Sequence, residues 1–205
     1  MKKHFLRVKN SLRQSAVTGI IKWLGSHKRY AFLAAIAVGI IVFYTAEFKA
    51  VITLAIFGII SSTITTYKRV IRMPPVLELI SLTTVMVTLF YGPIVGIFYT
   101  IIVNLASEVM SGYPDVMTLT YLPSRTVQVL FVWIAHSLNP DMGIAALGIW
   151  SVIIFNLVQQ PVFMFLTDAE QRLKAVYFVA LNIPINILIF KFLAVPLYTL
   201  LKLII

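Results

Sequence analysis

The sequence predicts an all-α membrane protein, a polytopic bundle of six to seven transmembrane helices preceded by a basic amphipathic N-terminal helix. Of its 205 residues, 60% are hydrophobic and 12% are charged, and the mean hydropathy is +0.95. Soluble domains carry roughly a quarter charged residues, so this chain has too little polar surface to cover a water-soluble globule. In addition, residues 74–112 form a long run whose only charges are Glu78 and Glu108.

Residues 1–29 predict a helix that lies on the membrane surface. Eight of the 17 basic residues fall in this stretch, and no acidic residue occurs before Glu47. Apolar side chains recur at helical spacing from Phe5 to Leu24, with basic residues on the other faces. This pattern is typical of an interfacial amphipathic helix that binds anionic lipid headgroups, and a solvated tail is the alternative. Because the basic stretch adjoins a membrane segment, nucleic acid is not expected as a partner.

Residues 30–205 are expected to form the bundle, with residues 50–205 as its core and residues 30–48 as a possible extra N-terminal helix. Most of the apolar segments approach the ~20 residues that cross a hydrocarbon core. The predicted segments are 30–48, 50–67, 74–90, 93–110, 122–138, 143–167 and 175–205. The connections between them are a basic loop at 68–72, a polar loop at 111–123, a turn at 139–141 and a mixed-charge loop at 168–174. Pro184 and Pro196 are expected to break the last segment.

The run at residues 74–112 predicts a tight helical hairpin. Gly92 and Pro93 separate its two apolar segments, and two prolines stand at its start. Proline is favourable in the first turn of a helix, because the N–H that it lacks would have no partner there. The hairpin is expected to bring Glu78 and Glu108 to or near one face of the membrane.

The distribution of basic residues predicts an orientation in the plasma membrane. With seven spans, the basic N-terminus, the loop at 68–72, Arg125, and Arg172 with Lys174 all fall on one side. The positive-inside rule then favours a cytoplasmic N-terminus and an outer C-terminus. If residues 30–48 are re-entrant or interfacial instead, the orientation of everything after them reverses.

Arg125 and Gln128 lie three residues apart, so both occupy one face of their predicted helix. Charged side chains inside apolar spans are costly and face a cavity or a partner. A guanidinium can hold a carboxylate through two parallel hydrogen bonds, so Arg125 suits an anionic ligand. An internal ion pair with Glu108 or Asp115 is an equal alternative.

Amide side chains gather beside prolines in the last two segments. Asn156 and Gln159 precede one proline, and Asn182 and Asn186 flank another, four residues apart on one face. Such amides suit recognition of a neutral polar ligand in a shared cavity. They also suit pairing between helices, which contributes about 0.6–2 kcal/mol per contact.

No arrangement of residues indicates catalysis, a cofactor or a metal, so the protein is not expected to be an enzyme. The three histidines lack metal-ligand spacing, and the absence of cysteine excludes thiol chemistry. A lipid-modifying enzyme that uses Glu78, Glu108, Arg125 or His136 is an alternative that the spacing does not favour.

From about residue 50 onward, the chain resembles the substrate-binding S components of energy-coupling-factor (ECF) vitamin transporters. The shared pattern comprises a small-residue helix, Pro-Pro-Val-Leu-Glu at 74–78, Gly92-Pro93-Ile-Val-Gly96, a polar loop with Gly112 and Pro114, a helix face with Arg125 and Gln128, and a last helix with Leu181-Asn182 and Asn186. In that family, a six-helix membrane subunit captures a vitamin or related micronutrient. It then works with a membrane coupling subunit and two ATPases.

The resemblance implies roles for particular residues. The ligand-facing set is Arg125, Gln128, Asn156, Gln159 and Asn182, to which the amide pattern adds Asn186. The small side chains of Ala55, Gly58 and Ser62, spaced three to four residues apart, would contact the coupling subunit. The region from Asn104 through Glu108 to Gly112 is similar to the MreD family of cell-shape scaffolds. That similarity implies the alternative function, a non-catalytic scaffold subunit of a membrane complex.

Overall fold

A computed structural model describes residues 32–33, 36, 38–40, 45–67, 77–112 and 117–205, and it contains helices but no strand among them. The chain divides into two units, Met1–Lys49 and Ala50–Ile205, and the architecture below is that of the second. The predicted amphipathic helix at residues 1–29 lies outside the described residues. So do most of the predicted segment at 30–48 and the basic loop at 68–72.

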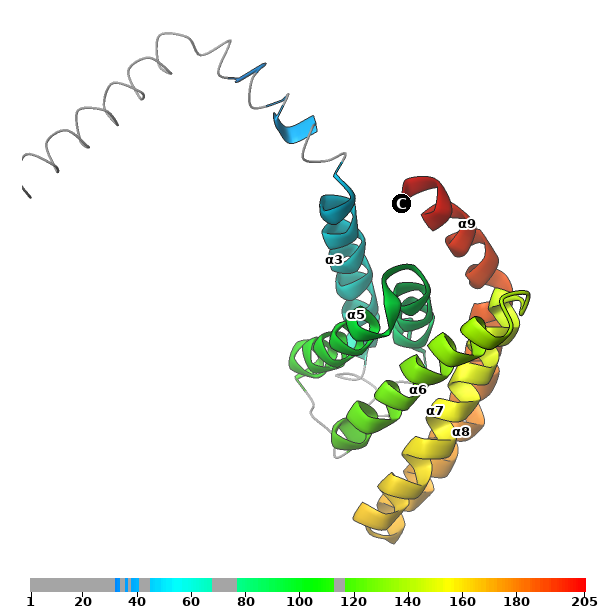
Figure 1. The fold of residues 1–205 in the computed structure, drawn as a ribbon. Helices are drawn as coiled ribbons and strands as arrows, with labels where there is room; N and C mark the ends of the chain where they lie inside the picture. The colour runs from blue at the N-terminus through cyan, green and yellow to red at the C-terminus, as the bar shows by residue number, and fades with distance from the viewer. Residues whose placement is uncertain (1–31, 34–35, 37, 41–44, 68–76, 113–116) are drawn as a thin grey trace, which may run out of the picture. The chain divides into compact units, whose positions relative to one another are not determined.

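The elements follow one another in the order shown in Figure 1. They are α3 (Ala46–Ile64), the 3-10 turn η1 (Thr65–Tyr67), α5 (Ile80–Ser111), α6 (Met117–Leu138), α7 (Ile144–Leu166), α8 (Ala169–Ile189), the π-helical turn η2 (Phe190–Ala194) and α9 (Val195–Ile204). Four stretches among the described residues are long and apolar enough to cross a membrane: Glu47–Tyr67, Ile80–Ser111, Ile144–Leu166 and Gln171–Ile204. For the described residues, this confirms the prediction of an all-α protein with helices long and apolar enough to cross a membrane.

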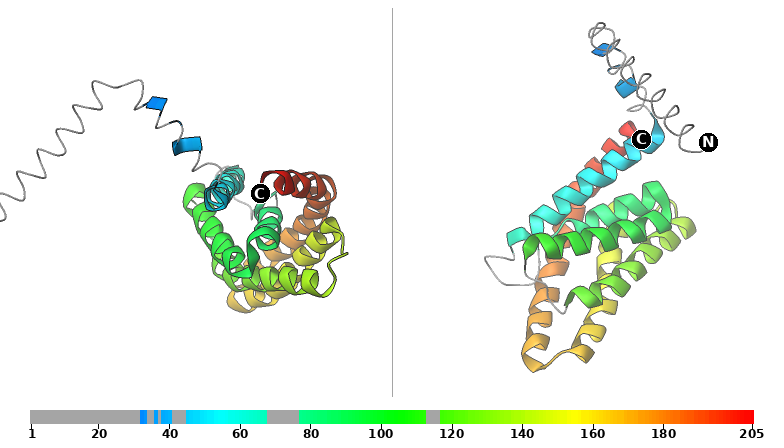
Figure 2. Two further views of the ribbon diagram at one scale, coloured as in Figure 1. Left: turned by 45° about the horizontal axis from the view of Figure 1, so that its top comes forward. Right: turned by 90° about the vertical axis from the view of Figure 1, so that its left-hand side faces the viewer.

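The predicted hairpin is confirmed within α5, which reverses direction at Gly92. Gly92 has φ 85° and ψ 173°, a conformation outside the helical region. The Thr84 hydroxyl donates a hydrogen bond of 3.1 Å to the hydroxyl of Thr100. In a straight helix these residues would lie about 24 Å apart, so the arms at 80–91 and 93–111 fold back on each other. Figure 2 shows the two arms running side by side.

Gly96 allows the two arms to approach closely. A Cβ atom at Gly96 would lie 2.5 Å from Oγ1 of Thr88 and 3.4 Å from its Cα atom. A side chain at this position would therefore push the arms apart. Small residues serve the same purpose at many helix contacts in membranes.

The first arm of α5 is shorter than predicted, because the helix begins at Ile80 and not at residue 74. Residues 77–79 are described and are not helical. An arm of twelve residues, 80–91, rises about 18 Å, against about 30 Å for a hydrocarbon core. The physical reason is a contact across the bundle, since the Glu78 side chain lies 2.6 Å from Arg125 of α6, just before the helix starts.

Helix α6 begins at Met117, five residues before the predicted start, so the predicted polar loop is shorter. Thr120 and Tyr121 suggested a loop, but both are buried, at 0% and 3% exposure. Tyr121 packs against Phe155 of α7, with ring centroids 5.9 Å apart. This packing supports a helix that continues through Pro123.

Of the two breaks predicted after residue 175, the one at Pro184 is wrong. Helix α8 starts at Ala169 and continues through Pro184 to Ile189. The irregularity is η2, which ends two residues before Pro196. A proline ring meets the carbonyl four residues earlier, which for Pro196 belongs to Phe192 within η2. The wider π turn accommodates the ring at this point.

The η2 turn places Phe190 against Gly148 of α7. Both residues are buried, and a Cβ atom at Gly148 would overlap the Phe190 ring. We expect Gly148→Ala to lower the free energy of unfolding by about 1–3 kcal/mol, because overpacking outweighs the better helix propensity of alanine. Thermal unfolding of the purified protein in detergent measures this loss.

Two further variants make the Gly148 prediction specific. Gly143→Ala is the matched control, because a Cβ atom at Gly143 meets nothing within 4 Å. Adding Phe190→Leu to Gly148→Ala should restore part of the lost stability. Equal unfolding temperatures for Gly148→Ala and Gly143→Ala would contradict the packing described here.

Candidate functional site

A layer of polar side chains crosses the bundle between α5, α6, α7 and α8. Its members, here called the polar layer, are Glu78, Ser81, Arg125, Gln128, Ser151, Asn156, Asn182 and Asn186, each at most 3% exposed. The guanidinium carbon of Arg125 lies 4.0 Å from the centroid of the Phe155 ring. Phe155 is the twelfth of 23 residues in α7 (Ile144–Leu166), so Arg125 sits at about half the height of that helix.

Arg125 is held by three side chains. Its Nη2 donates to Oε1 of Glu78 at 2.6 Å, and its Nη1 donates to the hydroxyl of Ser81 at 2.7 Å. Nη1 also donates to Oε1 of Gln128 on its own helix at 2.8 Å. The Ser81 hydroxyl in turn donates to Oε1 of Glu78 at 3.1 Å. Arg125 therefore connects α6 to the start of α5. This connection lies beside the middle of α7, far from either end of that helix.

The ion-pair partner of Arg125 differs from the partners expected from the sequence, which were Glu108 and Asp115. The partner is Glu78, and Asp115 lies outside the described residues. Glu78 was expected near a membrane face because its helix was expected to begin at residue 74. The later start of α5 instead leaves Glu78 level with the middle of α7.

Gln128 extends the polar layer to α7. Its Nε2 donates to the hydroxyl of Ser151 at 3.2 Å, and that hydroxyl donates to the carbonyl oxygen of Gly148 at 2.7 Å. The predicted pairing of Arg125 and Gln128 on one face is therefore observed. Sequence reasoning missed Ser81 and Ser151, and the only signal for Ser81 was its spacing of three residues from Glu78.

The two asparagines predicted on neighbouring helices meet between α7 and α8. Nδ2 of Asn156 donates to Oδ1 of Asn182 at 3.1 Å and to the carbonyl oxygen of Val152 at 2.8 Å. Asn186 lies one turn further along α8, and its Nδ2 donates to the backbone oxygen of Asn182 at 3.0 Å. These residues form the second half of the polar layer.

Gln159 makes a separate contact closer to the end of α7. Its Nε2 donates to the hydroxyl of Thr120 on α6 at 3.3 Å, and its Oε1 accepts from Nε2 of Gln160 at 2.6 Å. No hydrogen bond joins it to Arg125 or Asn182 in the described part of the chain. Of the six predicted ligand-facing residues, five therefore belong to the polar layer and Gln159 lies beside it.

Several atoms of the polar layer have no hydrogen-bond partner among the described residues. They are Nε of Arg125, Oδ1 of Asn156, Nδ2 of Asn182 and Oδ1 of Asn186. Leaving a buried donor or acceptor unpaired costs roughly 1–3 kcal/mol in proteins, and no water is available within a bilayer core to offset it. The set offers both donors and acceptors, which is what a bound polar solute requires.

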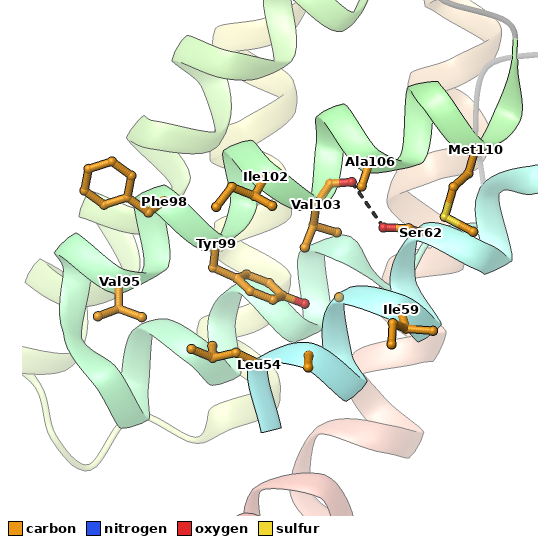
Figure 3. A pocket seen from close by; sticks show the side chains of 12 residues that line it. Leu54, Ile59, Ser62, Val95, Phe98, Tyr99, Ile102, Val103, Ala106 and Met110 are labelled. Carbon is orange, nitrogen blue, oxygen red and sulfur yellow. Dashed lines mark hydrogen bonds between the residues drawn. The ribbon is translucent and has the colours of Figure 1, made fainter. Parts of the chain in front are cut away.

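An apolar groove lies between α3 and the second arm of α5 (Figure 3), with a volume of about 440 Å³. The three predicted partner-contact residues, Ala55, Gly58 and Ser62, all line it. Ala55 is exposed, Gly58 lies against Val103, and the Ser62 hydroxyl donates to the Val103 carbonyl oxygen at 3.4 Å. Gly58 and Ser62 therefore contribute to packing within the bundle as well as to the groove.

A second apolar groove of about 340 Å³ lies between α3, the first arm of α5 and the η2–α9 segment. Residues of the polar layer line neither groove. Because each of its members is at most 3% exposed, the polar layer is closed to solvent in this structure. Within the described residues, no three histidine, aspartate or glutamate side chains gather in a way that could hold a metal ion.

The chain matches no protein-family model, no curated protein and no solved structure at a significant level. The functional interpretation therefore depends on the geometry of the polar layer and on the sequence pattern described above.

Proposed function

We propose that the protein is a multi-pass subunit of the plasma membrane that binds a small solute and passes it to an ATP-driven coupling module. This is the function of the ECF S components, which the sequence resembles. The observation that supports it best is the polar layer around Arg125, which is buried within apolar helices. Ionisable groups inside a membrane bundle are costly, and they typically mark the site or path of a solute.

The helical plan supports the same proposal. Among the described residues from Ala46 onward there are six helical segments, namely α3, the two arms of α5, α6, α7 and the α8–η2–α9 segment. Six helices are what the resemblance to S components implies. A helix at residues 30–48 would add a seventh.

The unpartnered atoms suggest which parts of a solute the polar layer would hold. Asn156 and Asn186 each present a free acceptor and Asn182 presents a free donor among the described residues. This combination suits a neutral polar group such as an amide or a ring nitrogen with its N–H. Arg125 would hold an acidic group on the same molecule.

A thermal-shift screen with water-soluble vitamins tests the proposal. A solute at 100 times its Kd should raise the free energy of unfolding by about 2.7 kcal/mol. We expect Asn182→Leu to abolish this stabilisation, since it removes the free donor and the acceptor for Asn156. Asn156 keeps its bond to the Val152 carbonyl oxygen, so the variant should fold.

Thr199→Val is the matched control for that screen, because Thr199 is exposed and its hydroxyl bonds only within α9. It should respond to the solute as the wild-type protein does. If no water-soluble vitamin stabilises the wild-type protein, the proposal fails.

A second candidate function is a non-catalytic scaffold of a membrane complex, and the groove that Ala55, Gly58 and Ser62 line favours it. The Ser62 hydroxyl is already bonded to the Val103 carbonyl oxygen, and the other side chains of the groove are nearly all apolar. A groove of this kind suits a helix of another membrane subunit. The same surface would serve the coupling subunit under the first proposal.

Filling the groove tests its role in assembly. We expect Ala55→Trp to prevent co-purification of partner subunits from membranes, because Ala55 is exposed at the groove and the larger side chain would occupy it. Ile56→Trp is the matched control, since Ile56 is exposed on α3 but does not line the groove. Blue-native electrophoresis measures the size of the complex. Equal complex size for both variants would show that the groove is not an interface with a partner subunit.

A further inference from the structure

The ion pair between Glu78 and Arg125 is poorly explained by stability alone. The two side chains are 2% and 1% exposed, with an N–O distance of 2.6 Å. Removing two charges from water costs several kcal/mol per ion, and replacing such pairs by apolar residues is often neutral or stabilising. The ion pair lies at about half the height of α7, far from the helix ends where water is within reach, so the free-energy cost of burying its charges is large.

The guanidinium of Arg125 holds this carboxylate through one hydrogen bond. Only Nη2 donates to Glu78, whereas Nη1 donates to the neutral oxygens of Ser81 and Gln128. Nε has no partner among the described residues. Arginine commonly holds a carboxylate through two parallel bonds, so the Nε–Nη2 edge is half used here.

The start of α5 adds a second positive element at the same place. Its N-cap residue, Leu79, provides no side-chain cap, and the first hydrogen bond of the helix runs from the N–H of Thr83 to the carbonyl oxygen of Leu79 at 2.9 Å. The N–H groups before Thr83 therefore have no partner within the helix, and they carry positive partial charge. Ser81 lies in this first turn and contacts both charged side chains.

We propose that Glu78 occupies the position that a carboxylate group of the solute takes when the solute is bound. The solute carboxylate displaces the Glu78 side chain and binds the Nε–Nη2 edge of Arg125. This inference rests on the proposed function and names the chemical class of its solute. Arg125 carries one positive charge and pairs with the single negative charge of Glu78. A carboxylate therefore fits this position better than a doubly charged phosphate does. Glu78 precedes α5, so its side chain can turn away without breaking a backbone hydrogen bond of that helix, and it gives up only its bonds to Arg125 and to the Ser81 hydroxyl.

Binding of matched acid and neutral compounds to the full-length protein in detergent tests the inference. The probes are nicotinate with nicotinamide, biotin with biotinamide, and pantothenate with pantothenol, and phosphate serves as a second anion. At least one acid should bind in preference to its neutral counterpart, and phosphate should not bind. Glu78→Gln should bind that acid about 10-fold more tightly, because the competing charge is gone.

Asp141→Asn is the control for charge removal, because Asp141 is exposed in the α6–α7 turn, and it should leave affinity unchanged. Binding with no preference for the acid, or no gain in Glu78→Gln, would overturn the inference and leave solute binding intact. Failure of all water-soluble vitamins, these compounds included, to bind any variant would overturn the proposed function as well.

A second variant tests the inference by rescue of stability, because Glu78→Ala leaves Arg125 buried without its charged partner. Glu78→Ala leaves space for a small carboxylate beside Arg125. Formate should raise the unfolding temperature of this variant by about 4 °C or more relative to the same concentration of chloride. If formate and chloride have equal effects, no external carboxylate can replace Glu78, and the inference is wrong.

Discussion

Arg125→Met is expected to lower the free energy of unfolding by about 3–5 kcal/mol, because it leaves the Glu78 carboxylate buried without a charged partner. Glu78 is 2% exposed, and among the described residues its carboxylate then keeps one hydrogen bond, which it accepts from the Ser81 hydroxyl. The loss can be measured by reversible unfolding of the purified protein in mixed micelles. Methionine nearly matches the length of the arginine side chain, so the change tests charge more than volume.

The Arg125 prediction has two controls. Arg172→Met removes an exposed arginine and should change stability by no more than about 0.5 kcal/mol. The double variant Arg125→Met/Glu78→Met should recover most of the loss, because neither charge then remains buried. A loss below about 1 kcal/mol for Arg125→Met would show that Glu78 finds another partner or reaches water.

Gly92→Ala is expected to destabilise the hairpin by about 1–3 kcal/mol or to prevent folding, since the backbone at Gly92 is accessible essentially to glycine alone. Its φ of 85° and ψ of 173° lie outside the left-handed helical region as well as the right-handed one. The effect can be read from the unfolding temperature and from the yield of monodisperse protein.

Asparagine substitutions provide a sharp contrast for this prediction. Gly112 ends α5 with φ 62° and ψ 16°, a left-handed conformation that asparagine tolerates. Gly112→Asn should therefore be mild, whereas Gly92→Asn should be as damaging as Gly92→Ala. Equal losses of stability in Gly112→Asn and Gly92→Asn would contradict this expectation. They would mean that any positive φ destabilises the variant, and not the particular backbone conformation at Gly92.

The hairpin could be predicted from the sequence because its signal is local. Gly92 and Pro93 are adjacent, and each restricts or permits backbone conformations without help from distant residues. The same local reasoning predicted the turn before α7, where Met142 N–H donates to the Asn139 carbonyl oxygen at 3.1 Å. It failed at Pro184, where a break was expected, and at residues 117–121, where a loop was expected, because packing across the bundle determines whether a helix continues there.

The members of the candidate site were more predictable than their pairing. Arg125, Gln128 and the three asparagines stood out because charged and amide side chains are rare in apolar segments. Which acid meets Arg125 depends on where α5 begins and how it packs on α6, and neither is encoded by nearby residues. Ser151 gave no signal, since hydroxyl side chains commonly bond to their own helix, as Ser151 also does to Gly148.

We expect the polar layer, which is closed in this structure, to open and admit a solute. Because the chain has no native cysteine, Ser151→Cys introduces a unique thiol into that layer. A small water-soluble methanethiosulfonate reagent should modify Cys at this position slowly, and a bound solute should slow the reaction further. Asn139→Cys, in the exposed α6–α7 turn, should react at once with or without solute. No modification at position 151 over hours, in protein whose Asn139→Cys counterpart reacts fully, would contradict the account.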